Sequence, residues 1–488
     1  RRTMPAILAI AWSVSLAPGA PTAAPRAPPR PLLGPPPVPK YYAKLYHAQP
    51  ADHFNAENHE TFRQLYLLNA TWWAGPGAPI VLYTGAEGSG IESIFAHSGW
   101  VLHLARELKA MAVFAEMRFF GESQPFVDPF EPSPRRLGLL SVEQALADYA
   151  ALVNALRDAF AAWASPVVAV GGSLAGTLAF LLRAKYPSVA SAALASSAPI
   201  LGYVGLCDEY GWYRVATSTF EKQAPGCPAM VRAAFASLLR AAPAEVTKAF
   251  NTCSPATPAT AGALAAAATD QLAALAESAY PRSTSPVVST CAMIDPSKGV
   301  GALAPVLSNG GACINISLAE GRPRTRRLNP LGGVDHPDWA ARAWLYIACT
   351  EVVHPISSNN VTDMFPSRRW SLPSLSAYCN ETFGVTPRAE WLPETMGMSG
   401  GAARLSEVTS RVIFTNGRLD PWFSQSVTAN VSDTIVAINI DDGAHHSDLG
   451  SPLNPWPSTS DSPSLQRARQ EQLALLRQWL GVGSSAAT

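Results

Sequence analysis

Apolar residues follow two periodicities that alternate between residues 41 and 201. Short, wholly apolar runs are separated by segments in which apolar residues recur every three or four positions. The apolar runs are typical of strands buried on both faces of a parallel sheet. Four such strands are predicted here, at Ala78–Thr84, Ala112–Ala115, Pro166–Val170 and Ala190–Ala195. The alternation of strands and helices predicts an α/β fold with a mainly parallel sheet.

The clearest predicted helix spans Leu140–Phe160, between the second and third of these strands. Ser141, followed three residues later by Gln144, has the pattern of a capping box at a helix start. Apolar side chains then recur at helical spacing and predict one buried face: Val142, Leu146, Tyr149, Leu152, Val153 and Leu156.

The pattern changes between residues 202 and 400, where strand alternation is poor and several helices are predicted. Strand patterns return at residues 411–417 and at Thr434–Ile440. A closing helix is predicted from Ser462 and Pro463, which suit the N-cap and first helical positions. We therefore expect an α/β core in two parts, residues 41–201 and 401–488, with a mostly helical cap inserted at residues 202–400.

The N-terminus has the layout of a secretory signal over residues 1–24. Two arginines precede an apolar run, Ala6–Ala17, and small residues follow it. The run is shorter than the roughly 20 residues needed to span a bilayer. The proline-rich residues 25–40 predict an extended spacer. We expect a secreted or lysosomal/vacuolar protein without a membrane span.

Cysteines and glycosylation sequons also support entry into the secretory pathway. All seven cysteines lie between Cys207 and Cys379 and none forms a CxxC pair, which favours disulfides over a zinc site. Five N-x-S/T sequons are predicted glycosylation sites: Asn69, Asn315, Asn360, Asn380 and Asn430.

The charge balance excludes one class of partner. Lys and Arg total 36, as do Asp and Glu, and no basic stripe is present, so a nucleic-acid partner is not expected. The glycines at positions 85, 88 and 90 do not form a dinucleotide-binding pattern. We expect no metal or other cofactor, and a homodimer stays open.

The candidate nucleophile is Ser173, which lies in GGSLAG between a predicted strand and an apolar helix. A serine at a tight strand-to-helix turn is typical of the nucleophile elbow, in which small neighbours let strand and helix pack closely. Ala175 replaces the last glycine of the usual pattern. The alternative is a glycine-rich turn without catalysis.

A nucleophilic serine needs a base, and the base needs a carboxylate that orients it. Asp420 follows one predicted strand, and His445 and His446 follow the next. Serine, aspartate, histidine is the chain order of hydrolases with this kind of turn. The residue pattern alone does not choose between the two histidines.

Two sequence features are candidates for holding the substrate. The backbone N–H of Leu174, directly after the nucleophile, would give one oxyanion donor, and the loop YTGAEGSG, which contains Gly85, would give the other. Glu87 in that loop is either a contact for a substrate amine or a structural anchor. Trp422 is either a wall of a proline pocket or part of the core.

Several separated blocks resemble the prolyl carboxypeptidase and dipeptidyl peptidase II family of serine peptidases. They are YTGAEG, VFAEMRFFGES, GGSLAGTLAFLLRAKYP, ACTEVVHPISSNNVTDMFP, NGRLDPW and GAHHSDL, and the similarity covers about residues 40–480. The resemblance implies an α/β-hydrolase core with a helical, disulfide-bonded cap. It also implies that Ser173 is the nucleophile, Asp420 the carboxylate and His445 the base.

The same resemblance implies a disulfide pattern. It pairs Cys227 with Cys291, Cys253 with Cys313 and Cys349 with Cys379, and leaves Cys207 unpaired. The chain also departs from the family pattern at several positions, among them the loop FSQS after Trp422, which is usually glycine-rich. Met117 stands where histidine is usual and Ala86 where asparagine is usual, Leu174 and Ala175 interrupt GGSYGG, and Leu345 takes the place of an aspartate of the dipeptidyl branch.

The resulting hypothesis is a serine exopeptidase that hydrolyses short peptides after proline and releases N-terminal dipeptides. The main alternative is a Pro-Xaa carboxypeptidase on the same scaffold. Two further alternatives are an esterase or lipase with this fold and a binding protein that has lost its activity.

Overall fold

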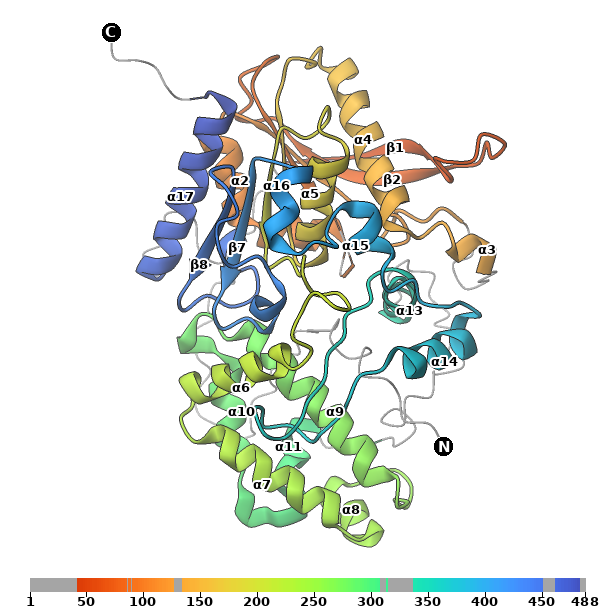
Figure 1. The fold of residues 1–488 in the computed structure, drawn as a ribbon, viewed down its shortest axis with the longest axis vertical. Coiled ribbons are helices and arrows are strands. Elements are labelled where there is room, and N and C mark those ends of the chain that lie inside the picture. The colour runs from red at the N-terminus through yellow and green to blue at the C-terminus, as the bar shows by residue number, and fades with distance from the viewer. Residues whose placement is uncertain are drawn as a thin grey trace, which may run out of the picture.

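An eight-stranded sheet organises the computed structural model of the chain (Figure 1). The structure describes residues 42–85, 87–88, 90–126, 134–307, 313–314, 337–450 and 461–482. The predicted signal at residues 1–24 and spacer at residues 25–40 lie outside the described residues. The strands are β1 Ala43–Pro50, β2 Thr61–Asn69, β3 Ile80–Thr84, β4 Met111–Ala115, β5 Val167–Gly172, β6 Ala192–Ser196, β7 Val412–Gly417 and β8 Ile435–Ile440.

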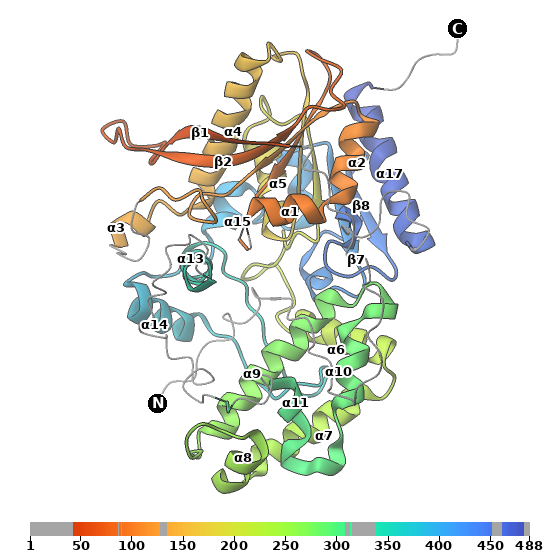
Figure 2. The same cartoon turned by 180° about the vertical axis from the view of Figure 1, so that it is seen from behind.

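The strand order across the sheet is β1-β2-β4-β3-β5-β6-β7-β8. β1 pairs with β2 and β2 with β4 in antiparallel fashion, and the other pairs are parallel. The β1–β2 hairpin projects beyond the other strands (Figure 2). The order of β3 and β4 in the sheet is the reverse of their order in the chain, and β2 runs antiparallel to both of its neighbours. This is the arrangement of α/β-hydrolases, so the predicted fold class is confirmed.

Helices cover both faces of the sheet because successive strand residues point to opposite sides. Val81, Val168 and Ile413 face a core shared with α2 and α17. Ile80, Ala169 and Phe414 face the core shared with α4 and α5. These helices are α1 Ile91–His97, α2 Gly99–Glu107, α3 Pro134–Leu137, α4 Val142–Ala159, α5 Leu174–Lys185 and α17 Pro463–Leu480.

Both predicted N-caps are present, although the reciprocal bond of the predicted capping box is not, because the Gln144 side chain bonds to Asp52 and to the His53 N–H instead. The Ser141 side chain accepts a hydrogen bond from the Gln144 backbone N–H, 3.2 Å away, at the start of α4. Ser462 does the same for Leu465 at the start of α17, where Pro463 is the first helical residue. Each cap satisfies a backbone N–H that has no partner within its helix.

The chain between β6 and β7 is mostly helical and builds a second hydrophobic core. Helices α6 to α10 pack on one another and on Leu419, Trp422 and Ala444, which belong to loops after β7 and β8 (Figures 1 and 2). The helices of this segment are α6 Gly211–Gln223, α7 Cys227–Arg240, α8 Pro243–Phe250, α9 Thr260–Leu275, α10 Pro286–Met293, α11 Ala304–Leu307, α13 Pro337–Thr350, α14 Leu372–Phe383, α15 Trp391–Met396 and α16 Leu405–Val408. The domain boundaries at residues 202 and 400 stay predictions.

Three disulfides fasten this segment: two join pairs of helices, α7 with α10 and α13 with α14, and the third joins two loops. The pairs are the ones that the family resemblance implies: Cys227–Cys291, Cys253–Cys313 and Cys349–Cys379. Cys207 is a free, half-buried thiol. Within the described part of the chain, no helix is both long and apolar enough to cross a membrane.

The sequons differ in accessibility. Asn360, Asn380 and Asn430 are exposed, and Asn315 lies outside the described residues. Asn69, in contrast, is 2% exposed at the end of β2, and its side chain accepts a hydrogen bond from the Thr71 N–H. A glycan at Asn69 has no room in this fold, whereas the exposed sequons stay predicted sites.

Candidate active site

Ser173 lies at the turn between β5 and α5 in a backbone conformation that few residues adopt. Its φ is 59° and its ψ is −129°. A non-glycine residue in this region is strained and persists only where the surrounding structure enforces it, which is a common property of functional sites. The turn exposes the serine at the carboxyl end of the sheet, where ligands bind in open α/β folds.

The glycines around Ser173 are required by close packing. A Cβ atom at Gly171 would lie 2.2 Å from the Ala175 carbonyl oxygen, and one at Gly176 would lie 2.9 Å from the Ser196 carbonyl oxygen. A Cβ at Gly172 would lie 2.9 Å from the His446 ring. The pattern GGSLAG therefore reflects contacts with the following helix, the neighbouring strand and the histidine loop. Ala175 is accommodated as a buried residue of α5.

Asp420 and His445 form a hydrogen-bonded pair. Asp420 follows β7, is 1% exposed, and its Oδ2 atom lies 2.8 Å from His445 Nδ1. Its other oxygen accepts the Trp422 backbone N–H at 3.0 Å, which fixes the carboxylate. Burial alone would lower the pKa of His445, but the Asp420 carboxylate, with Glu277 and Glu87 farther away, raises that pKa to about 9.

His446 occupies a different environment from its neighbour. Its ring centroid lies 4.5 Å from that of His445, and its backbone φ is 33°. Burial, reinforced by the nearby His445, lowers the pKa of His446 to about 3. Of the two histidines, only His445 is hydrogen-bonded to Asp420. The residue pattern alone did not distinguish them.

Ser173, His445 and His446 line one cavity of about 470 Å³. Within the described part of the chain, no hydrogen bond joins Ser173 Oγ to the His445 ring. Such bonds are often long in enzymes without substrate and shorten in the reacting complex. The cavity therefore brings together a strained serine and a histidine that is already oriented by a carboxylate.

Two glutamates give the cavity an acidic lining. Glu87 lies in the loop after β3, and its Oε2 atom is buried without a hydrogen-bond partner among the described residues. Glu277 lies after α9, and its Oε1 atom accepts the Trp422 indole N–H at 2.9 Å. Burial raises the pKa of each carboxyl to about 7. No lysine or arginine is among the described residues that line the cavity.

The structure narrows the predicted oxyanion donors. The Leu174 N–H has no hydrogen-bond partner within the described residues, as an oxyanion donor requires. Gly85, however, donates its N–H to the Ala115 carbonyl at 2.8 Å and accepts the Tyr149 hydroxyl on its own carbonyl. The N–H of Gly85 is therefore not free to serve as the second oxyanion donor.

Trp422 both packs in the core and lines the cavity. Its ring is 6% exposed and contacts Trp212 and His354, with centroids 6.0 and 5.3 Å away. His354 also lines the cavity, and its Nδ1 atom lies 2.5 Å from the Gly202 carbonyl oxygen. Because a carbonyl oxygen only accepts, the Nδ1 atom of His354 carries the proton and donates this hydrogen bond. Sequence reasoning missed His354 and Glu277, because only the tertiary fold brings the inserted segment to the cavity.

The departures from the family pattern differ in their relation to the cavity. Leu174 and Ala175 line it. Met117 is fully buried in the core and is not a lining residue, and Leu345 packs against the same core while its neighbour Trp344 lines the cavity. Ala86 lies outside the described residues.

A serine at a strained elbow, beside an aspartate–histidine pair on an α/β-hydrolase sheet, defines a serine hydrolase. Comparison with known proteins gives the family. The model of the serine carboxypeptidase S28 family matches residues 49–472, and the chain belongs to this family and is a serine-type peptidase.

Individual relatives cover most of the chain. Human lysosomal Pro-X carboxypeptidase is 34% identical, over 91% of this chain and 90% of that protein. Mouse thymus-specific serine protease is 31% identical, over 88% of this chain and 86% of that protein. Among solved structures, an epoxide hydrolase from Vigna radiata has a TM-score of 0.36 and 10% identity, over 90% of this chain and 98% of that one.

Proposed function

We propose that Ser173, His445 and Asp420 form the catalytic triad of this peptidase. Ser173 Oγ attacks the scissile carbonyl while His445 Nε2 takes its proton and later returns it to the leaving amine. Asp420 holds the Nδ1–H tautomer and stabilises the imidazolium. The Leu174 N–H, with a donor from the loop after Gly85, stabilises the oxyanion. The observation that supports this proposal is the 2.8 Å Asp420–His445 contact in the cavity that also contains Ser173.

A fluorophosphonate probe tests the triad directly. The wild-type protein should be labelled at Ser173, and Ser173→Ala should not be labelled. Peptide mapping of the labelled protein identifies the modified serine. A folded wild-type protein that is not labelled would contradict the proposed triad.

We further propose that the cleaved bond follows a proline near a peptide terminus. The flat ring of Trp422 and the nearby Tyr203 and Trp344 line the cavity, and such faces suit a pyrrolidine ring. Human lysosomal Pro-X carboxypeptidase, by its name, acts at Pro-X. A cavity of about 470 Å³ suits a short terminal segment of a peptide.

The acidic lining supports release of N-terminal dipeptides. A peptide amine that enters a buried cavity keeps its charge only if a carboxylate pairs with it. Glu87 and Glu277 offer two carboxylates at the cavity, and the unpartnered Oε2 of Glu87 is available to an ammonium group. Among the described residues that line the cavity, a terminal carboxylate would find neither lysine nor arginine.

The carboxypeptidase alternative has support of its own. Relatives named lysosomal Pro-X carboxypeptidase are 34% identical over nine-tenths of the chain. In addition, burial raises the pKa of Glu87 and Glu277 to about 7, so both carboxyls are neutral at acid pH. A neutral carboxylic acid donates a hydrogen bond and no longer repels a substrate carboxylate.

Paired peptides separate the two modes. Lys-Pro-reporter with a free amine, the same peptide N-acetylated, and an N-blocked Pro-Phe acid should be assayed at pH 5 and pH 7.5. Cleavage of the free-amine reporter alone, reduced in Glu87→Gln, is the result expected for dipeptide release. Release of Phe from the blocked acid would show the carboxypeptidase mode, and equal cleavage of both reporters would exclude amine recognition.

The compartment and assembly also belong to this proposal. We propose a lysosomal or secreted protein, supported by the lysosomal relatives and the predicted signal. A homodimer remains a prediction, and analytical ultracentrifugation of the glycosylated protein would test it.

A further inference from the structure

The last residue of β6 holds the backbone of the candidate nucleophile. The carbonyl of Ser196, which ends this strand, accepts the Ser173 N–H at 2.9 Å. A Cβ at Gly176 would also lie 2.9 Å from this carbonyl oxygen, so α5 packs directly against the same point. Ser196 is fully buried. The position of the Ser173 backbone therefore depends on the end of β6.

The same strand end is bonded to the histidine loop, residues 441–450 after β8. The Ser196 hydroxyl donates to one oxygen of the Asp448 carboxylate, three residues after His445. The hydroxyl of the next residue, Ser197, accepts the His446 N–H at 2.8 Å. Because β7 lies between β6 and β8 in the sheet, these bonds join segments that do not pair directly. Ser196 thus contacts both the backbone of the nucleophile and the loop of the base.

Helix α17 holds Asp448 from its other side. Gln472 Nε2 donates to the second carboxylate oxygen of Asp448 at 2.8 Å, and Arg469 Nε donates to the Asp448 backbone carbonyl at 2.8 Å. The Oε1 atom of Gln472 in turn accepts the Trp100 indole N–H at 2.5 Å. Asp448, Gln472 and Arg469 are all buried. Both oxygens of a buried carboxylate are therefore bonded, one to β6 and one to α17, as a charge removed from water requires.

We propose that Asp448 is a positioning residue that sets the distance between the nucleophile Ser173 and the base His445. The bond to Asp420 orients the His445 ring but does not tie it to Ser173, and within the described residues no hydrogen bond joins Ser173 Oγ to that ring. The separation of the two groups is therefore set by the segments that carry them, and the bond between Ser196 and Asp448 connects these segments. The proposal rests on the proposed triad, since the distance matters only if the two groups react.

Ser196→Ala tests this link, because it removes the hydroxyl and leaves the carbonyl that holds Ser173. A misplacement of about 1 Å can cost about 10²-fold in rate, so we expect kcat to fall roughly 10- to 100-fold. The second-order rate of fluorophosphonate labelling should fall by the same factor, since it also needs the base beside the nucleophile. KM and the affinity for a product dipeptide should change less than about twofold, because neither depends on proton transfer.

Asp448→Ala breaks the same link from its other side. It should reproduce the loss of kcat and of labelling rate. Because both substitutions remove one shared bond, the double variant should lose little more than Asp448→Ala alone, whereas independent effects would multiply. Ser196→Ala deletes a single hydroxyl and keeps the test informative if Asp448→Ala does not fold.

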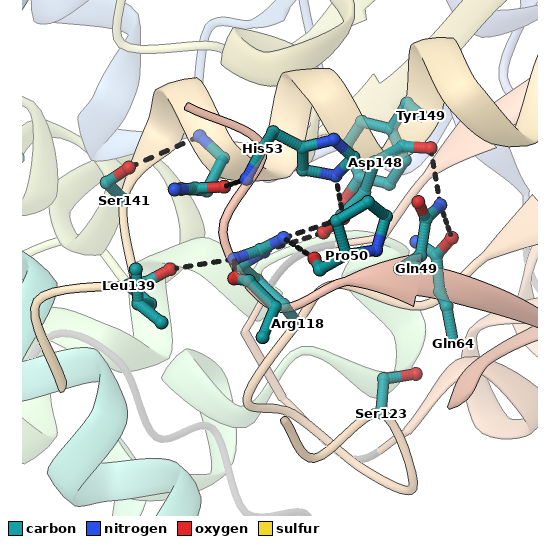
Figure 3. A network of polar contacts seen from close by, with 12 residues as sticks. Gln49, Pro50, His53, Gln64, Arg118, Ser123, Leu139, Ser141, Asp148 and Tyr149 are labelled. Carbon is teal, nitrogen blue, oxygen red and sulfur yellow. Dashed lines mark hydrogen bonds and ion pairs between the residues drawn. The ribbon is translucent and has the colours of Figure 1, made fainter. Parts of the chain in front are cut away.

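Ser141→Ala is the matched control. It also deletes one serine hydroxyl that makes a hydrogen bond, here with the Gln144 N–H at the start of α4 (Figure 3). Ser141 is not among the described residues that line the cavity. Loss of this helix cap should lower the melting temperature but leave kcat and the labelling rate at their wild-type values. The control therefore shows whether lower stability by itself slows labelling.

Three outcomes would overturn the inference. The first is a folded Ser196→Ala variant whose kcat and labelling rate stay within about twofold of wild type. The second is an equal loss of labelling rate and product affinity, which would indicate a general structural role. The third is a double variant in which the two losses multiply. A wild-type protein that is not labelled would instead contradict the triad itself, so failure of the triad and failure of this link give different results.

Discussion

The carboxylate of Glu277, in the inserted segment, accepts the indole N–H of Trp422 at 2.9 Å. Trp422 lies two residues after Asp420, and the Glu277 carbonyl also accepts the His445 N–H at 3.1 Å. One residue of the insertion thus contacts the loops that hold both the carboxylate and the base. Because Glu277 is 8% exposed and acidic, it acts on His445 through its charge as well as through contact.

Glu277→Gln should shift the pH dependence of catalysis to lower pH. Asp420 and then Glu277 favour the charged form of His445, so removing the Glu277 charge lowers the pKa of His445 from about 9. The base then stays deprotonated to lower pH, and the acid limb of the kcat/KM profile moves down. Glutamine keeps an acceptor for Trp422. Glu394→Gln, an exposed position on α15, is the control, and an unshifted acid limb in Glu277→Gln would contradict the charge effect.

Asp420→Asn should reduce kcat about 10⁴-fold while the protein stays folded. Asparagine can still accept the Trp422 N–H, but it no longer holds the Nδ1–H tautomer of His445 or stabilises its charge. Steady-state kinetics with circular dichroism and a melting curve would check this. Activity above about one per cent of wild type would show that Asp420 is not the orienting carboxylate.

Gly171→Ala should destabilise the fold by about 1–3 kcal/mol or more and abolish fluorophosphonate labelling. The new Cβ would lie 2.2 Å from the Ala175 carbonyl and push α5 away from β5. Gly262→Ala is the matched control, because that glycine lies in α9 with nothing within 4 Å of a new Cβ. It should raise stability by roughly 0.5–1 kcal/mol. Urea unfolding measures both, and equal effects would refute the packing argument.

Cys207 should resist alkylation in the native protein and react after unfolding. Burial, with Asp208 and Glu209 nearby, raises the pKa of its thiol to about 12, so almost no thiolate is present at pH 8. Iodoacetamide labelling with mass spectrometry, native and in non-reducing denaturant, is the measurement. One cysteine should be labelled after denaturation, at Cys207. Rapid native labelling, or Cys207 in an intrachain bond, would contradict the expectation.

The strands that form the middle of the sheet were predictable, and its edge hairpin was not. Central strands such as β3 and β5 are buried at every position, so they appear as continuous apolar runs. In β1 most side chains are exposed, and polar residues interrupt the pattern. Hydrophobic periodicity indicates burial, so it detects the buried edge strand β8 but not β1, whose side chains are mostly exposed and which is held by backbone pairing with β2.

The candidate site likewise contains residues that the sequence predicts and residues that only the fold brings to the cavity. Ser173, Asp420 and His445 each follow an apolar strand. Because these strands are predicted to be parallel, the three residues are expected to meet at the carboxyl ends of the strands. The choice of His445 over His446 depends on which imidazole lies against the Asp420 carboxylate, and spacing does not encode this contact. Glu277 lies in an alanine-rich helical stretch without any catalytic pattern, and only the packing of the insertion on the core brings it to the cavity.

The second hydrophobic core limits how this enzyme can be re-engineered. Helices α6 to α10 share that core with Leu419, Trp422 and Ala444, which flank Asp420 and His445. A chimera that exchanges the insertion for one from a relative would also exchange the packing of both loops and the acceptor of the His445 N–H. Substrate range and turnover are therefore not separable modules in this scaffold, and a grafted cap would need matched changes at the loops after β7 and β8.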